Sequence, residues 1–200
     1  MSSKEQDNKD GRLPPGQRSI ERILRWGKEH STITGSVPKI DLRKWVLIID
    51  GEVEKPLKLN WNEILKIPKV ESVSDFHCVE GWSVLDCRWE GVQFKYIVDL
   101  VKPRENAKFV SFECADGYTT SLSLEALLGE DALLAHKLDG KPLEEGLGAP
   151  LRLVVPNKYA YKSAMWITRI KFTSRKESGY WESRGYSDTA DVWKDDRFSR

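Results

Sequence analysis

Hydrophobic and polar positions alternate along several short segments of the chain, a pattern typical of β-strands with one buried face. The segments 45–59 and 107–124 each contain an Asp-Gly pair between two such runs, which predicts a strand, a tight turn and a second strand. Further strands are predicted at 70–79, 131–143 (again with an Asp-Gly turn), 149–156 and 163–172. The chain should therefore consist mainly of strands.

The helices predicted by the same pattern are short. Residues 19–30 place several apolar side chains on one side of a helix. Asn60 can cap a helix over 61–67, and another begins at about Gln93. A helix of one to two turns is expected at 124–129 and a loop at 80–86. Because helices and strands do not alternate regularly, the pattern predicts an α+β fold with mixed or antiparallel sheets.

The N-terminal segment of the chain is polar, and the C-terminal segment is rich in aromatic residues. Residues 1–30 are expected to form an N-terminal extension, partly disordered or draped over the domain of residues 31–175. Residues 176–200 carry aromatic side chains too widely spaced for one helix face. We expect this C-terminal extension to pack on the domain as an extended segment, anchored by Trp181, Tyr186, Trp193 and Phe198.

Acidic and basic residues nearly balance, with a net charge of +1. Nucleic-acid binders usually carry a basic excess, so no nucleic-acid partner is expected. No segment has the roughly 18 apolar residues that a membrane helix needs, and the start of the chain lacks the apolar run of an export signal. The sequence therefore predicts a cytoplasmic protein without a membrane span.

The three cysteines, Cys78, Cys87 and Cys114, contain no C-x-x-C pair, which argues against a disulfide framework or a four-thiolate metal site. Cys78 ends a predicted strand in DFHCVEGWSV, where it can face a cleft. One interpretation is a buried structural cysteine. Another is a cysteine hydrolase, although His77, its neighbour in the strand, should point to the opposite face and cannot easily act as its base.

Several segments carry a resemblance to a known family. DFHCVEGWSV is followed, in order, by WEGVQF, AKFVSFECADGYTTSLSL, LLAHKLDGKPL and GAPLRLVVPNKYAYKSAMW. Together they resemble the sulfite oxidase superfamily, the molybdopterin-dependent oxidoreductase domain, over about residues 38–173, in a small cytoplasmic-type branch. The resemblance implies the sulfite-oxidase-type fold and an enzyme of two-electron oxygen-atom transfer on a small oxyanion or sulfoxide-type molecule.

The resemblance also implies a cofactor site. Cys78 stands where the family's cysteine binds the metal of Mo-molybdopterin, a tungsten form being an alternative, and a soft thiolate suits a sulfur-rich metal centre. Arg152 matches the arginine that contacts the pterin and its phosphate. Tyr118 falls at an active-site tyrosine. The other implied cofactor contacts are His77, Cys114, Lys162, Ser163, Ala164, Met165, Thr32 and Thr34.

The sequence departs from the family pattern at several points. Leu147 and Met165 stand where many relatives have polar residues, and the arginines that follow the cysteine in sulfite oxidases are absent. The absent arginines put sulfite oxidation in doubt, and the implied haem and dimerisation domains are not seen. We therefore expect a separate electron-transfer partner. A non-catalytic cofactor-binding subunit or carrier of the same fold is the alternative.

Overall fold

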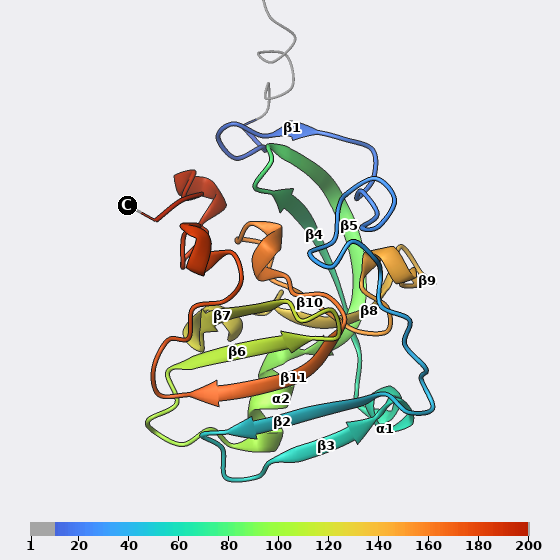
Figure 1. Cartoon of the computed structure of the whole chain (residues 1–200), viewed down its shortest axis with the longest axis vertical. Coiled ribbons are helices and arrows are strands. Elements are labelled where there is room, and N and C mark those ends of the chain that lie inside the picture. The colour runs from blue at the N-terminus through green and yellow to red at the C-terminus, as the bar shows by residue number, and fades with distance from the viewer. Residues whose placement is uncertain (1–10, 200) are drawn as a thin grey trace, which may run out of the picture.

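The computed structural model describes residues 11–199 and consists mainly of two β-sheets (Figure 1). In the six-stranded sheet the order is β1-β5-β8-β10, with β4 paired to β5 and β9 paired to β8. Its strands are β1 (Arg18–Ser19), β4 (Val70–Cys78), β5 (Trp82–Gln93), β8 (Leu133–Leu138), β9 (Lys141–Pro142) and β10 (Arg152–Val154). The parallel pair β1–β5 and the antiparallel pairs β4–β5, β5–β8, β8–β9 and β8–β10 make this sheet mixed.

The five-stranded sheet has the order β3-β2-β11-β6-β7. Its strands are β2 (Val46–Gly51), β3 (Leu57–Asn60), β6 (Phe109–Cys114), β7 (Thr119–Ser123) and β11 (Ile167–Thr173). The pairs β2–β3 and β6–β7 are two of the predicted hairpins. The Asp-Gly pair of β6–β7 lies in the connection as predicted, whereas Asp50 and Gly51 belong to β2 and the chain turns after them. The strand β11 lies between the two hairpins, parallel to β2 and antiparallel to β6, and so joins them into one sheet. The α+β fold with mixed sheets is confirmed.

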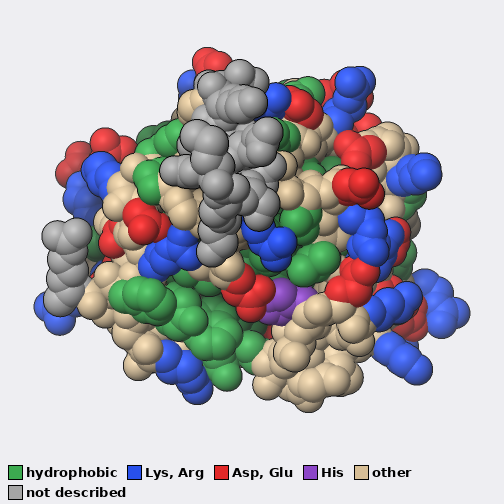
Figure 2. All heavy atoms as spheres, turned by 90° about the horizontal axis from the view of Figure 1, so that it is seen from above, with side chains coloured by type: hydrophobic (Ala, Val, Ile, Leu, Met, Phe, Trp, Pro, Cys, Tyr) green, Lys and Arg blue, Asp and Glu red, His purple; other side chains and the backbone are tan. Residues whose placement is uncertain are grey.

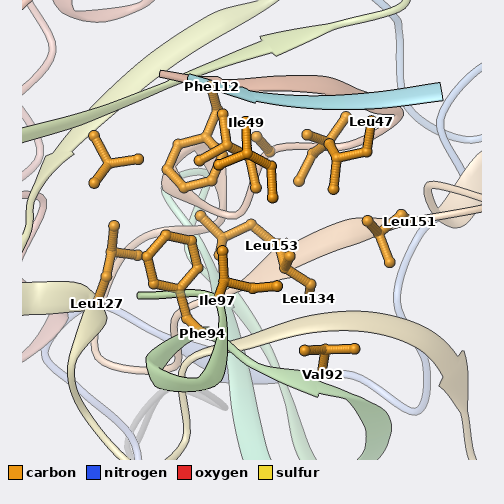
Figure 3. Packing of buried hydrophobic residues seen from close by; sticks show 14 of the residues in the cluster. Leu47, Ile49, Val92, Phe94, Ile97, Phe112, Leu127, Leu134, Leu151 and Leu153 are labelled. Atoms are coloured by element: carbon orange, nitrogen blue, oxygen red, sulfur yellow. The ribbon is translucent and has the colours of Figure 1, made fainter. Parts of the chain in front are cut away.

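Two α-helices accompany the sheets. In α1 (Trp61–Lys66), the Asn60 side chain accepts a hydrogen bond from the Glu63 N–H at 3.1 Å, and the Glu63 carboxylate accepts one from the Asn60 N–H at 2.8 Å. The helix α2 (Phe94–Val101) buries Phe94, Ile97 and Val101. Figure 3 shows Phe94 and Ile97 packed with the inward side chains of the five-stranded sheet, among them Phe112. The helices predicted over 61–67 and from about Gln93 are confirmed.

The segment 19–30 is not helical, so that prediction is wrong. The Arg18 N–H donates to the Gly81 carbonyl at 3.0 Å, and the Ile20 N–H donates to the Ser83 carbonyl at 2.8 Å. The chain thus continues the six-stranded sheet at its edge beside β5. A short isolated helix is marginal in water, and here the start of the segment pairs with β5 instead of forming a helix.

The predicted loop at 80–86 is also wrong, because β5 already begins at Trp82, paired with Cys78 of β4. The helix predicted at 124–129 reduces to a single 3-10 turn. Single 3-10 turns occupy Glu125–Leu127, Glu145–Leu147, Ala160–Lys162, Glu182–Arg184 and Val192–Lys194. Within residues 11–199, no helix has the length and apolar content that crossing a membrane requires.

The C-terminal segment packs on the body only in part. Trp181 and Tyr186 are half-buried, whereas Trp193 is 49% and Phe198 59% exposed. Two of the four predicted aromatic anchors are therefore in place. Figure 1 shows this segment beside the β4–β5 end of the six-stranded sheet, close to the start of the described chain.

Candidate functional site

A cavity of about 410 Å³ lies where several distant segments of the chain meet. Its walls come from the segments 26–33, 78–80 and 160–166, together with Asp116, Tyr118, Tyr180, Trp181 and Tyr186. Figure 2 shows the face above β1, on which hydrophobic side chains gather beside acidic and histidine side chains. Among the described residues, no lysine or arginine side chain lines the cavity.

Cys78 lies on the wall of this cavity, at the last position of β4. The strand turns back into β5 through Val79, Glu80 and Gly81, and the Gly81 N–H donates to the Cys78 carbonyl at 3.0 Å. Gly81 has a φ of +94°, a conformation that side-chain-bearing residues rarely adopt. The turn therefore requires glycine at this position, and it holds the cysteine at the end of a rigid strand.

Burial raises the pKa of the Cys78 thiol to about 12, while backbone hydrogen bonds from Glu80 and Val79 act in the opposite direction. The thiol keeps its proton near neutral pH unless a metal displaces it. A raised pKa is the opposite of what an activated cysteine nucleophile needs. The electrostatics of the site therefore do not favour the cysteine-hydrolase interpretation.

Two residues beside Cys78 were not singled out by the sequence. The ligand atoms of His30, Cys78 and Glu80 all lie within 4.8 Å of one another. His30 Nε2 is 3.1 Å from Glu80 Oε2, and the ring stacks on Trp26 with centroids 4.6 Å apart. The sequence could have predicted that Glu80 lies near Cys78, since it follows the cysteine by two residues in the same turn. It could not have predicted this for His30, which lies 48 positions before Cys78 in the chain.

The cysteine turn is held from both ends of the described chain. Gln17 Nε2 donates to the Cys78 carbonyl at 3.1 Å, and Gln17 Oε1 accepts from Ser83 Oγ at 2.9 Å. From the C-terminal segment, Arg197 donates to the Val79 carbonyl at 2.6 Å. His77 Nδ1 lies 2.7 Å from the same Ser83 Oγ. His77 therefore belongs to the network behind Cys78 and does not line the cavity.

The turn predicted to cradle the cofactor contributes Ser163, Ala164 and Met165 to the cavity wall. Lys162 points away from it. Its ammonium group forms a buried ion pair with Glu182 and donates to the Ser121 carbonyl at 3.0 Å. Burial lowers the pKa of Lys162, and Glu182 opposes that effect. The positive charge of Lys162 is thus balanced inside the protein.

Arg152 is fully buried behind the same turn. Its guanidinium donates to the carbonyls of Leu147 (3.0 Å) and Ser163 (3.3 Å) and lies over the rings of Phe76 and Trp89. Burial lowers the pKa of Arg152 to about 10. In the described part of the chain, Arg152 Nε has no hydrogen-bond partner. Arg152 does not line the cavity, but it supports the wall through Ser163.

Tyr118 lines the cavity, and its hydroxyl donates to the Tyr161 carbonyl at 2.5 Å. Burial raises the pKa of Tyr118 well above its usual value, so the phenol stays protonated. Cys114 is buried in the core and does not line the cavity. Thr32 lines it and Thr34 does not, although both hydroxyls donate to the Ser36 carbonyl, at 3.2 and 3.0 Å.

Of the residues predicted for the site, the cavity thus brings together Cys78, Tyr118, Thr32, Ser163, Ala164 and Met165. The others, His77, Cys114, Arg152, Lys162 and Thr34, lie behind or beside its wall. A second cavity, of about 620 Å³, contains none of the predicted residues, and no cysteine of the described chain reaches it. The smaller cavity is therefore the candidate site.

A mixed α+β fold with one cysteine at the wall of a cavity of this kind defines a class of cofactor-binding oxidoreductase domain. The family model "Oxidoreductase molybdopterin binding domain" matches residues 34–181. The chain belongs to this family.

Several known proteins resemble the chain. The "Uncharacterized oxidoreductase YuiH" of Bacillus subtilis is 38% identical over 197 residues, covering 97% of this chain and 96% of that protein. The "Protein-methionine-sulfoxide reductase catalytic subunit MsrP" of Campylobacter jejuni is 35% identical over 158 residues, covering 70% of this chain and 53% of that protein. The chain thus spans about half of this longer relative.

Among solved structures, the sulfane dehydrogenase SoxCD from Paracoccus pantotrophus matches with a TM-score of 0.66 and 20% identity. The match covers 74% of this chain and 42% of that one. At this identity the likeness concerns the fold alone, and it agrees with the expected sulfite-oxidase-type architecture.

Proposed function

We propose that this molybdopterin-binding oxidoreductase transfers an oxygen atom to or from the sulfur of a small sulfoxide-type substrate, with the metal held by Cys78. The observation that carries the proposal is a cysteine on the wall of a cavity lined by aromatic and acidic side chains. Residues 31–175 would form the catalytic domain, with 1–30 and 176–200 as extensions on either side.

The residues of the cavity fit the cofactor. A volume of about 410 Å³ falls within the roughly 300–1,000 Å³ typical of small-molecule and cofactor sites. Cys78 offers the soft sulfur donor that a sulfur-rich metal centre prefers. Ser163, Ala164 and Met165 line the cavity and can contact the pterin. Arg152 and Lys162 do not line it, so these two side chains would reach the pterin phosphate only if this wall moves.

When bound, the molybdenum cofactor would supply a two-electron couple and a position for the transferred oxygen atom. The protein's part is to bind and orient. Cys78 would hold the metal as a thiolate, which the backbone N–H groups of Val79 and Glu80 would stabilise. Tyr118 keeps its proton and can donate it to a substrate oxygen only by releasing the Tyr161 carbonyl.

The cavity lining supports a neutral sulfur substrate over an oxyanion. Glu80 and Asp116 on the wall repel anions, and no lysine or arginine of the described chain lies there to compensate. Aromatic rings make favourable contacts with sulfur atoms. The lining provides them in Trp26, Tyr161, Tyr180, Trp181 and Tyr186. The name of the relative MsrP, a methionine-sulfoxide reductase, agrees with this choice of substrate.

We further propose a separate electron-transfer partner and a cytoplasmic location. The name of MsrP describes it as a catalytic subunit, which supports a partner that carries electrons. The free thiols Cys78, Cys87 and Cys114 suit a reducing compartment. Fractionation of the source cells tests the location, and a molybdenum-to-tungsten ratio in the purified protein tests the choice of metal.

The experiment compares wild type, Cys78→Ala and Cys87→Ala protein from a molybdenum-replete host. Cys87 is the matched control, since it is equally buried but lies outside the cavity. We expect wild type and the control to contain metal and to oxidise a reduced dye with a sulfoxide as acceptor. Cys78→Ala should lose turnover and change the metal's spectrum while remaining folded.

Absence of both molybdenum and tungsten from wild type, or faster turnover with sulfite than with sulfoxides, would contradict the proposal. The alternative, a cofactor-binding subunit without catalysis, is motivated by Leu147 at a position where many relatives have a polar residue. It predicts full occupancy of the cofactor with no dye turnover on any acceptor.

A further inference from the structure

The donor atoms of His30, Cys78 and Glu80 bring together an imidazole nitrogen, a thiol sulfur and a carboxylate, all within 4.8 Å. These are the ligand types that Zn²⁺ binds, at about 2.0–2.3 Å each. We propose that they form a zinc site in the chain that has not yet taken up its molybdopterin. Nothing in the proposed function requires this site.

The orientation of His30 supports a metal ligand. His30 Nδ1 lies 3.1 Å from the Ser31 carbonyl, which can only accept a hydrogen bond, so Nδ1 carries the proton. A histidine that ligates a metal usually makes this kind of bond with its other nitrogen. The ring is also held by stacking on Trp26 at 4.6 Å. The hydrogen bond and the stacking therefore orient the lone pair of Nε2 toward the turn that carries Cys78.

The contact between His30 and Glu80 also supports a metal site. With the proton on Nδ1, the Nε2 lone pair faces the Glu80 carboxylate at 3.1 Å. A nitrogen lone pair and a carboxylate oxygen that face each other at this distance can both bind one metal ion. Ligand atoms on one tetrahedral zinc lie about 3.3–3.6 Å apart. The His30–Glu80 separation is close to this value, and Cys78 Sγ lies no more than 4.8 Å from either ligand atom.

The charges of the site also suit a divalent ion. A zinc ion with one thiolate, one carboxylate and a neutral imidazole is electrically neutral, which limits the cost of burial. Binding replaces the thiol proton of Cys78 by a sulfur–zinc bond and releases that proton to solvent. Three protein ligands leave a fourth position open to the cavity, which a water molecule can take.

The zinc form and the molybdenum form exclude one another, since Cys78 Sγ would be the protein ligand in both. This part of the inference rests on the proposed function. Zinc would occupy the cysteine of newly made chains and protect it from oxidation, and the molybdopterin would have to displace it. Loading of the cofactor would then depend on the zinc supply of the cell.

The test uses the full-length chain from a host that cannot make molybdopterin, titrated with Zn²⁺ against a chelator of known affinity. Wild type should bind zinc equimolar with the chain. His30→Gln, Glu80→Gln and Cys78→Ser should each weaken binding by more than the roughly 10–100-fold that loss of an outer-shell partner costs. Cys87→Ser and His136→Gln, which change a cysteine and a histidine outside the cavity, should bind as wild type does.

Cobalt substitution gives an independent readout. Co²⁺ bound to wild type should show a thiolate charge-transfer band, which disappears in Cys78→Ser and shifts in His30→Gln. Stoichiometric zinc binding that survives both His30→Gln and Glu80→Gln would overturn the proposal, as would the absence of zinc binding in wild type. His30 is half-buried and Glu80 exposed, so circular dichroism should show the His30→Gln and Glu80→Gln variants folded.

Mutual exclusion is tested by producing the protein in a molybdopterin-competent host with and without added zinc. Molybdenum content should fall as zinc content rises, and their sum should stay equimolar with the chain. Protein that carries both metals in full would overturn the exclusion. Protein without molybdenum even at low zinc would contradict the proposed function instead, while the zinc titration above would still decide the zinc site.

Discussion

The two regions of this protein differ in the charged and histidine side chains that they bury. The cluster under the five-stranded sheet is apolar, and Leu47, Ile49, Phe112 and Phe172 are fully buried in it (Figure 3). The region around β4, β5 and the 160–166 turn also has an apolar cluster, with Phe76, Trp82 and Trp89 buried in it. In addition, this region buries the polar side chains of Arg152, Lys162, His77 and Ser83. Apolar burial is non-directional and stabilises the fold, whereas hydrogen bonds and ion pairs fix where each atom lies.

The difference indicates a division of work between the sheets. A buried polar group costs free energy unless it is paired, so the site region gains less stability from the same buried area. In return, Gln17, Ser83 and Arg197 hold the cysteine turn in one position. We expect changes in the apolar cluster to lower overall stability, and changes in the site region to alter the site first.

The largest effect is expected for Phe112→Ala. Truncating a fully buried phenylalanine should lower the free energy of unfolding by about 3–5 kcal/mol, because it removes apolar contacts and leaves a cavity. Urea denaturation of the cofactor-free chain measures this. Leu42→Ala, at a side chain 44% exposed, is the control and should stay within about 0.5 kcal/mol of wild type. A Phe112 variant of wild-type stability would remove the basis for the comparison.

An intermediate effect is expected for Gln17→Ala. The change removes one hydrogen bond from the Cys78 carbonyl and one from the Ser83 hydroxyl. The Gly81 N–H and His77 Nδ1 remain as partners, so the loss should cost about 0.5–1.5 kcal/mol. Loosening of the cysteine turn should also shift the spectrum of the bound metal, which Phe112→Ala should leave unchanged. Arg18→Ala is the control, because its side chain is exposed at the next position of the chain. An unaltered metal spectrum in Gln17→Ala would show that the turn does not depend on this residue.

The smallest effect concerns His136 and pH. Burial lowers the pKa of His136 in the folded protein, and Glu90 only partly opposes it. Below an unfolded-state pKa of about 6.5, the unfolded chain binds a proton that the folded one does not. The contribution of His136 is therefore complete above that pH and is lost as pH falls toward the lower folded pKa. Denaturant midpoints at pH 7.5 and pH 5.5 should differ less in His136→Gln than in wild type; an equal difference would exclude this histidine as the cause.

The elements that could be predicted from the sequence are those with local causes. The hairpin β6–β7 follows from alternation and its Asp-Gly turn, the strands β2 and β3 follow from alternation, and α1 follows from its Asn60 cap. The segment 19–30 could not be predicted, because its start pairs with β5 through Ile20 and its middle bonds through Trp26 to Gly146, both far along the chain. Helical periodicity in so short a segment is weaker than pairing with an existing sheet edge.

In the candidate site, too, only the features with local causes could be predicted from the sequence. The amino-acid sequence by itself determined the strand that ends in Cys78, the glycine turn after it and the family to which the chain belongs. Only the tertiary structure decided that His30 and Gln17 reach that turn and that Arg152 and Lys162 point away from the cavity. Strand and turn propensities act between neighbours in sequence. The direction of a buried charge depends on the partners that the whole fold brings to it, such as Glu182 for Lys162.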